Sequence, residues 1–282
     1  MFDLKEESFK MDYWQKTVKI EPISKRMKVY QLPSNYNNAR FVSELKELAK
    51  EKKCDKIILY VKKNERKLID QNEFHKEGFI KGFFNGDTAY IYSLFCNPKR
   101  KTHVSLLEEQ NVLKIVAGDN KTIQDVSMPQ GYTMRRAAET DVFQMAKLYT
   151  EVFKTYPTPM NDPDYIIEAM NNHVYFTVIE KDGEIISACS ADVLPEFEAA
   201  ELTDCSTLPL YRGKGLLTSQ FFYLIDFMKK KNIKTVFSYS RAVSVGMNLI
   251  NKRFGFKYGG RLIQNSNISG RLETMNIWYK NI

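Results

Sequence analysis

The chain has 282 residues, of which 27% are charged and 43% hydrophobic, as expected of a globular protein with one large or two medium domains. Residues 1–7 are acidic and have no apolar core, so we expect no secretory signal, and no run approaches the roughly 18 apolar residues of a membrane span. The net charge is +8, but the basic excess is spread through mixed Lys–Glu segments, which argues against nucleic acid as a partner, and we expect no membrane partner.

The cysteines are scattered and form no C-x-x-C pair; they are Cys54, Cys96, Cys189 and Cys205. The three histidines follow no ligand spacing. This pattern predicts a reduced, cytoplasmic location and no metal site.

The first half of the chain alternates strand and helix signals. In chain order we expect strands and turns over 1–35, a helix over 38–52, a buried strand over 56–61, a helix over 65–74, a β-hairpin over 79–95 and a linker with a short helix over 97–128. Asn85-Gly86 supplies the turn chemistry of the hairpin.

The second half carries clearer patterns. We expect a strand at 132–135, helices over 140–153 and 163–170, a hairpin over 174–194, a strand over 199–207, a helix over 218–229, a strand over 235–239, a helix over 245–253 and strands over 256–263 and 273–279.

A basic glycine-containing loop lies between the strand over 199–207 and the next helix. It includes Arg212-Gly213-Lys214-Gly215. Its backbone N–H groups and the helix dipole would converge on one anion, above all a phosphate, although a plain turn remains an alternative. The Walker loop and the dinucleotide fingerprint do not fit, because Lys214 lies between the two glycines and a third glycine is missing.

This loop resembles the acyl-CoA loop of the GNAT acetyltransferases, Arg/Gln-x-x-Gly-x-Gly/Ala. Arg212 and Gly215 occupy its first and fourth positions, whereas Leu217 replaces the usual small residue at the sixth. The element order over residues 131–282 and the helix-to-strand corner ending in Gly255-Phe256 are also similar to the family.

The resemblance implies an α/β protein with a GNAT fold in residues 129–282. Residues 1–128 would form a smaller α/β domain plus linker. The order of elements in 50–95 repeats that in 228–279, including an aromatic-glycine corner in each. We interpret the first domain as a degenerate half-copy of the second, the alternative being a common α/β unit that occurs twice.

The resemblance further implies that acetyl-CoA is the co-substrate. Its pantetheine arm would follow the backbone of Ser206, Thr207 and Leu208. Its pyrophosphate would lie on the loop and first helical turn, and two polar residues would contact the arm. These remaining positions are Arg212, Gly213, Lys214, Gly215, Leu216, Leu217, Thr218, Ser244 and Asn248.

A run of carboxylates without an intervening Lys or Arg precedes the loop, and suits a cationic amine substrate. It comprises Asp192, Glu196, Glu198, Glu201 and Asp204. Strand alternation puts Glu201 and Asp204 on opposite faces, so only one can face the cleft. We predict Asp204 as the general base and Glu201 as the second candidate, while a solvated strand edge remains an alternative.

The general acid is not evident. At the place where the family has a tyrosine this chain has Asn251, which cannot act as an acid. Tyr239 is a possible donor, although a buried strand tyrosine is the more ordinary reading of that residue.

The full layout is similar to the bacterial and archaeal β-lysine N-acetyltransferases. That resemblance implies acetylation of the ε-amine of β-lysine to the compatible solute N-ε-acetyl-β-lysine. The alternatives are another amine (a polyamine, an amino acid or a protein lysine) and a CoA-binding sensor without turnover. The first domain would cover the cleft or make a homodimer contact.

Overall fold

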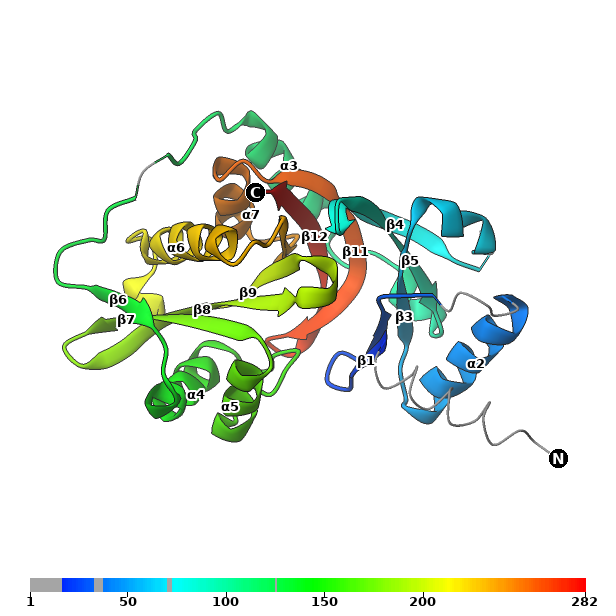
Figure 1. Ribbon diagram of the computed structural model, residues 1–282, viewed down its shortest axis with the longest axis horizontal. Helices are drawn as coiled ribbons and strands as arrows, with labels where there is room; N and C mark the ends of the chain where they lie inside the picture. The colour runs from blue at the N-terminus through cyan, green and yellow to red at the C-terminus, as the bar shows by residue number, and fades with distance from the viewer. Residues whose placement is uncertain (1–16, 33–37, 70–72, 125) are drawn as a thin grey trace.

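The computed structural model describes residues 17–32, 38–69, 73–124 and 126–282. Their strands form one sheet in the order β1-β2-β3-β5-β4-β11-β12-β10-β9-β8-β7-β6 (Figure 1). The strands are β1 (Val18–Glu21), β2 (Arg26–Val29), β3 (Lys56–Val61), β4 (His75–Phe84), β5 (Asp87–Phe95), β6 (Thr133–Arg136), β7 (Val174–Lys181), β8 (Glu184–Leu194), β9 (Ala199–Thr207), β10 (Thr235–Arg241), β11 (Lys257–Ile268) and β12 (Arg271–Asn281).

Helices cover both faces of the sheet. They are α2 (Asn38–Glu51), α3 (Leu106–Gly118), α4 (Val142–Val152), α5 (Pro163–Asn171), α6 (Leu216–Lys230) and α7 (Val245–Arg253). In the C-terminal half, α4 and α5 lie on one face and α6 and α7 on the other (Figure 1). No helix in the described part of the chain is long and apolar enough to cross a membrane.

Most predicted elements are confirmed, but the helix predicted over 65–74 is wrong. The chain forms only a 3₁₀ helix, η1 (Lys63–Leu68), before it leaves the described residues at 70–72. Ile69 and Phe74 are both buried in the core beneath α2. Their spacing of five residues does not fit one face of an α-helix, so a regular helix over 65–74 would not bury both side chains. The predictions for 1–16 and 33–35 lie outside the described residues.

The two halves repeat one topology. The segment β1-β2-α2-β3-η1-β4-β5 has the same order as β8-β9-α6-β10-α7-β11-β12. In each copy the second and third strands are parallel, and the copies meet where β4 pairs antiparallel with β11. The α/β fold with a degenerate half-copy is thus confirmed. The aromatic-glycine corner is not a shared feature, because Gly78 lies inside β4 whereas Gly255 precedes β11.

Glycines allow β4 and β11 to cross closely. A Cβ on Gly260 would lie 2.4 Å from the Glu77 carbonyl oxygen and 2.5 Å from the Gly78 Cα. A Cβ on Gly259 would lie 2.2 Å from the Phe79 carbonyl oxygen. Only glycine therefore fits at this junction between the halves.

Buried charged residues of the N-terminal half also hold β11. Between Leu262 and Ser266 this strand leaves its register with β12, which frees backbone groups. Arg26 and Arg100 donate to the carbonyls of residues 264–265, and Lys56 donates to that of Ile263. Because buried backbone groups need partners, this network fixes the two halves against each other.

Helix α3 falls within the segment predicted as part of the first domain and its linker, yet it packs on the second half. Val112 and Val116 are buried in the same core as Phe254 and Phe256, and Ile123 N–H donates to the Arg253 carbonyl.

Candidate active site

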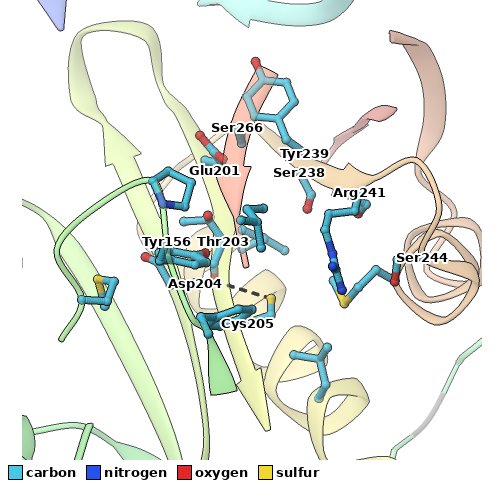
Figure 2. A pocket seen from close by; sticks show the side chains of 18 of the residues that line it. Tyr156, Glu201, Thr203, Asp204, Cys205, Ser238, Tyr239, Arg241, Ser244 and Ser266 are labelled. Atoms are coloured by element: carbon cyan, nitrogen blue, oxygen red, sulfur yellow. Dashed lines mark hydrogen bonds between the residues drawn. The ribbon is translucent and has the colours of Figure 1, made fainter. Parts of the chain in front are cut away.

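A gap between two parallel strands creates the main cavity. β9 and β10 are paired only from Ala199–Thr235 to Glu201–Phe237. Beyond these residues the strands separate, and a cavity of about 780 Å³ opens between them. Figure 2 shows Thr203, Asp204 and Cys205 on one side of this cavity, with Tyr239 and Arg241 on the other.

A β-bulge turns Asp204 into the cavity. Ser190 pairs with Thr203 and Ala188 with Ser206, so two residues of β9 oppose the single Cys189. Asp204 takes a left-handed backbone with φ of 52°. The Tyr149 hydroxyl donates to the Asp204 carbonyl at 2.6 Å, and Ser190 Oγ donates to Asp204 Oδ2 at 2.6 Å.

Glu201 and Asp204 both line the cavity, so the expectation that only one could face it is wrong. Regular alternation puts them on opposite faces, but the bulge shifts the parity at Asp204. In Figure 2 Glu201 lies toward Ser266 and Tyr239, whereas Asp204 lies near Tyr156 and Cys205.

Burial dominates the protonation of both carboxyls. It raises the pKa of Glu201 to about 7, although Lys28 and Arg26 act in the opposite direction. It raises the pKa of Asp204 to about 6, against the hydroxyls of Ser190 and Tyr156, which favour the ionised form. Carboxyls with a pKa near neutrality are suited to accept a proton from an ammonium group.

The predicted anion loop follows β9 at the mouth of the cavity. Gly213 and Gly215 have φ of 76° and 78°, and a Cβ on either would meet nothing within 4 Å, so the backbone is open to a ligand. Gly215 is the N-cap of α6, and no side chain caps this end of the helix. The N–H groups of the first turn therefore point at an open site that suits a phosphate.

A buried polar network holds α6 and this loop on the sheet. Gln220 of α6 accepts a hydrogen bond from Ser187 Oγ at 2.8 Å and donates to the Thr177 carbonyl at 3.0 Å. Ser187 Oγ also lies 2.8 Å from Thr207 Oγ1, at the end of β9. The network fixes the angle at which the helix approaches the cavity.

Most of the residues predicted to bind the cofactor line the cavity. They are Thr207, Arg212, Gly213, Gly215, Leu216, Leu217, Thr218 and Ser244. Lys214 is exposed beside Tyr211 and outside the lining. Ser206 is buried, and the N–H of Leu208 already donates to the Ile186 carbonyl.

Asn248 does not reach the cavity. Its side chain is fully buried, its amide nitrogen donates to the carbonyls of Arg241 and Ser244, and its oxygen accepts from Asn276 and Trp278. All four hydrogen bonds are used, so this side chain supports α7 instead of contacting a ligand. Asn251, at the family's tyrosine position, is equally buried and donates to Ser240 Oγ.

The acidic run divides in two. Asp192, Glu201 and Asp204 line the cavity. Glu196 is exposed, and Glu198 forms an ion pair with Lys234 on the surface, so neither contributes to the site.

Sequence reasoning missed Tyr156, which lies beside Asp204 (Figure 2). Burial raises the pKa of Tyr156 well above its usual value, so its hydroxyl stays protonated at neutral pH. Tyr239 lines the cavity too, with its hydroxyl 2.5 Å from that of Tyr60. The only sequence signal for Tyr156 was an aromatic residue in a proline-rich loop.

Sequence reasoning also missed the wall supplied by the N-terminal half. Lys19, Glu21, Arg26 and Lys28, all from β1 and β2, line the cavity. Lys19 reaches Asp192 of β8 at 3.5 Å across the mouth. The alternation of Arg26-Met27-Lys28-Val29 marked a strand with one charged face, but it gave no indication of where that face would lie.

A strand pair that separates, a glycine loop at a helix N-terminus and half-buried carboxylates beside it are features expected of an acyl-CoA-dependent transferase for amines. The model of the acetyltransferase (GNAT) family matches residues 142–256. "N-acetyltransferase YodP" of Bacillus subtilis is 37% identical over 260 residues, which cover 92% of this chain and 93% of that protein.

Two archaeal proteins named "Beta-lysine N(6)-acetyltransferase" are also similar. That of Methanococcus maripaludis is 30% identical, covering 90% of this chain and 92% of the relative. That of Methanosarcina mazei is 31% identical, covering 83% of this chain and 94% of the relative. The chain therefore belongs to the GNAT family, and it is an N-acetyltransferase.

The residues present fit acetyl-CoA, the acyl donor of this family. The uncapped N-terminus of α6 and the open glycine backbone would hold its pyrophosphate, and the gap between β9 and β10 would admit its pantetheine arm. Among the described residues, His, Cys, Asp and Glu form no group that could hold a metal ion.

Proposed function

We propose that this enzyme acetylates the ε-amine of β-lysine in the cytoplasm, producing N-ε-acetyl-β-lysine as a compatible solute. The observation that carries the amine chemistry is the pair of half-buried carboxyls, Glu201 and Asp204, which line the cavity on the strand that leads into the glycine loop. The names of the two archaeal relatives, which are similar over most of the chain, favour β-lysine as the particular amine.

In this proposal Asp204 is the general base. The bulge and the Ser190 hydrogen bond hold its carboxylate in the cavity, on the strand beside the gap that would receive the thioester. It would remove the proton of the substrate ammonium, so that the neutral amine attacks the acetyl carbonyl. Tyr156, beside Asp204, would then protonate the departing thiolate and recover its proton from the amine nitrogen as that nitrogen becomes the amide, while Asp204 releases the first proton to water.

The second candidate is acetylation of another small amine, since the name of the 37% identical relative gives no substrate. A sensor without turnover is not retained, because the chain belongs to a family of N-acetyltransferases.

The test is the release of free thiol from acetyl-CoA with β-lysine and lysine side by side, together with ornithine and a set of polyamines. Strong turnover on β-lysine and little on lysine is the expected result. Preferential turnover of any other amine would overturn the assignment of β-lysine.

A further inference from the structure

Strand β2 contributes two buried cationic side chains, Arg26 and Lys28, to the wall of the cavity. Arg26 and Lys28 alternate with Met27 and Val29, which pack in the core beneath α2. Both charged residues are only 4% exposed, although both line the cavity. Buried cations require counter-charges, so their partners indicate what each can bind.

Arg26 is committed to the protein. Its guanidinium pairs with Glu21 and donates to the Asn265 carbonyl at 3.0 Å and to Ser266 Oγ at 2.7 Å. These contacts fix β2 to β11 and leave the group little capacity for a ligand.

Lys28 is different. Its Nζ lies 2.9 Å from Glu21 Oε1 and 6.0 Å from the centre of the Tyr239 ring. Within the described part of the chain, Glu21 is the only hydrogen-bond acceptor that the structure gives this ammonium. An ammonium has three donors, so two remain available inside the cavity.

The local charge also leaves room for an anion. Glu21 offsets one of the two cations, Arg26 and Lys28. Glu201 is the next carboxyl to interact with this pair, and it lies toward Ser266, the residue that receives Arg26 (Figure 2). At the end of the cavity that faces the N-terminal half, Lys28 thus has unused hydrogen-bond donors, and the Glu201 carboxyl is the next carboxyl to interact with it.

We propose that Lys28 and Glu201 bind the amino-acid head group of the acceptor, Lys28 taking its carboxylate and Glu201 the ammonium that is not acetylated. This inference rests on the proposed function and deepens it, because it specifies a diamino acid as the substrate class. The transferred amine would then lie at Asp204. A strand advances about 3.3 Å per residue, so Glu201 and Asp204 are offset by up to roughly 10 Å, comparable with the length of a diamino acid.

In this proposal the N-terminal half binds the carboxylate, which distinguishes a diamino acid from a diamine. A polyamine has no carboxylate for Lys28, and binding it would leave the Lys28 donors unpaired in a buried site. Loss of a charged hydrogen bond of this kind corresponds to about a 10- to 100-fold difference in kcat/KM.

The experiment compares three diamino acids, β-lysine, lysine and ornithine, each with the diamine that remains when its carboxyl group is removed. The wild type and Lys28→Met are assayed on all pairs, with Lys25→Met as the control. Lys25 is in the same hairpin, is exposed and lies outside the cavity lining. Lys28→Arg tests rescue by a retained charge, and acetyl-CoA affinity reports whether each variant is folded.

The wild type is expected to prefer the acid in whichever pair it turns over. Lys28→Met should raise KM for that acid about 10- to 100-fold, leave its diamine within about threefold, and so remove the preference. Lys28→Arg should recover part of it, and Lys25→Met should behave as the wild type.

Equal use of acid and diamine by the wild type, or equal loss on both with Lys28→Met, would overturn the inference. The ratio of kcat/KM for the acid to that for its diamine tests the role of Lys28, whichever acid the enzyme uses. Which of the three acids is turned over best tests β-lysine as the substrate. If Lys28→Met does not fold, Glu201→Gln replaces it: KM should then rise for diamino acids, which have a second ammonium, and stay unchanged for ω-amino acids, which have a carboxylate and only the amine that is acetylated.

Discussion

The two copies of the repeated topology differ most where the second strand passes into the following helix. In the C-terminal half, β9 leads into Gly213 and Gly215 at the start of α6. In the N-terminal half, the corresponding segment, 30–37, contains no glycine. The glycines that would let the backbone approach an acyl-CoA phosphate are therefore present in the sequence of only one copy.

The equivalent strands also differ in charge. β9 places Glu201 and Asp204 in the cavity, whereas β2 places Arg26 and Lys28 there. The copy without these glycines therefore supplies a cationic wall of the cavity. In the arrangement proposed above, the C-terminal half binds the donor and supplies Glu201 and Asp204, while the N-terminal half contributes Lys28 to acceptor binding. The following experiments test this arrangement.

The largest effect is expected for Asp204→Asn. Without a base the rate should fall about 100- to 10,000-fold, while the affinity for acetyl-CoA is unchanged, because the loop is intact. Steady-state kinetics and calorimetric titration with CoA measure the two quantities. Full activity of this variant would show that Asp204 is not the base.

The pH dependence gives an independent check of the same residue. Burial raises the pKa of Asp204 to about 6, and the base must be ionised to accept a proton. The rate of the wild type should therefore rise as the pH increases through about 6, and this step should be absent from Asp204→Asn. A wild-type rate that is flat between about pH 5 and 7 would contradict the assignment.

Gly215→Glu tests the donor half. The carboxylate would repel the phosphate and occupy the open backbone, so we expect a loss of CoA affinity of at least about 100-fold. Gly86→Glu is the matched control, because Gly86 also has a positive φ, 103°, and open space around it, but lies in the N-terminal hairpin. Equal CoA affinity of the two variants would place the phosphate elsewhere.

Gly260→Ala tests the junction between the halves. The added Cβ would clash with the Glu77 carbonyl and the Gly78 Cα at a φ of 134°, so the free energy of unfolding should fall by about 2–3 kcal/mol. In the control, Gly270→Ala, φ is also positive, but the nearest atom is Lys154 Cδ at 3.8 Å, and about 1 kcal/mol is expected. Urea denaturation measures the free energy of unfolding of both variants. Equal decreases would mean that β4 and β11 can move apart with little loss of stability.

The smallest effect is expected for Glu201→Gln, in the free energy of unfolding and its dependence on pH. Folding raises its pKa from 4.5 to about 7 by burial, so the folded state binds this proton more tightly than the unfolded state. The stability from this group is complete below about pH 4.5 and is lost as the pH rises through about 7. Glu201→Gln should therefore be more stable than the wild type by on the order of 1–2 kcal/mol at pH 8, with the difference vanishing near pH 4.

Asp226→Asn, an exposed change on α6, provides the comparison and should shift stability by less than about 0.5 kcal/mol at either pH. If Glu201→Gln were instead less stable than the wild type at pH 8, the carboxylate would be a net stabilising partner of Lys28 and Arg26.

The sequence by itself determined the elements and the donor loop. Hydrophobic periodicity located α2, α6 and nearly all strands, and the spacing of Arg212, Gly213 and Gly215 marked the open loop at the start of α6, because these features depend on neighbours within a few residues. The helix predicted over 65–74 failed because distant packing, of Ile69 and Phe74 in one core, outweighed local preference.

Only the tertiary structure decided the acceptor site. The bulge at Asp204 depends on how β8 pairs with β9, and one extra residue reverses which side chains face the cavity. Lys28 and Glu201 line the same cavity only because the two halves form one sheet. The halves are held together where Gly78 pairs with Gly260 and where Arg26 bonds to β11. Contacts between residues so far apart in the chain leave no periodic signal in the sequence, since each strand shows only its own alternation and not the partner it will face.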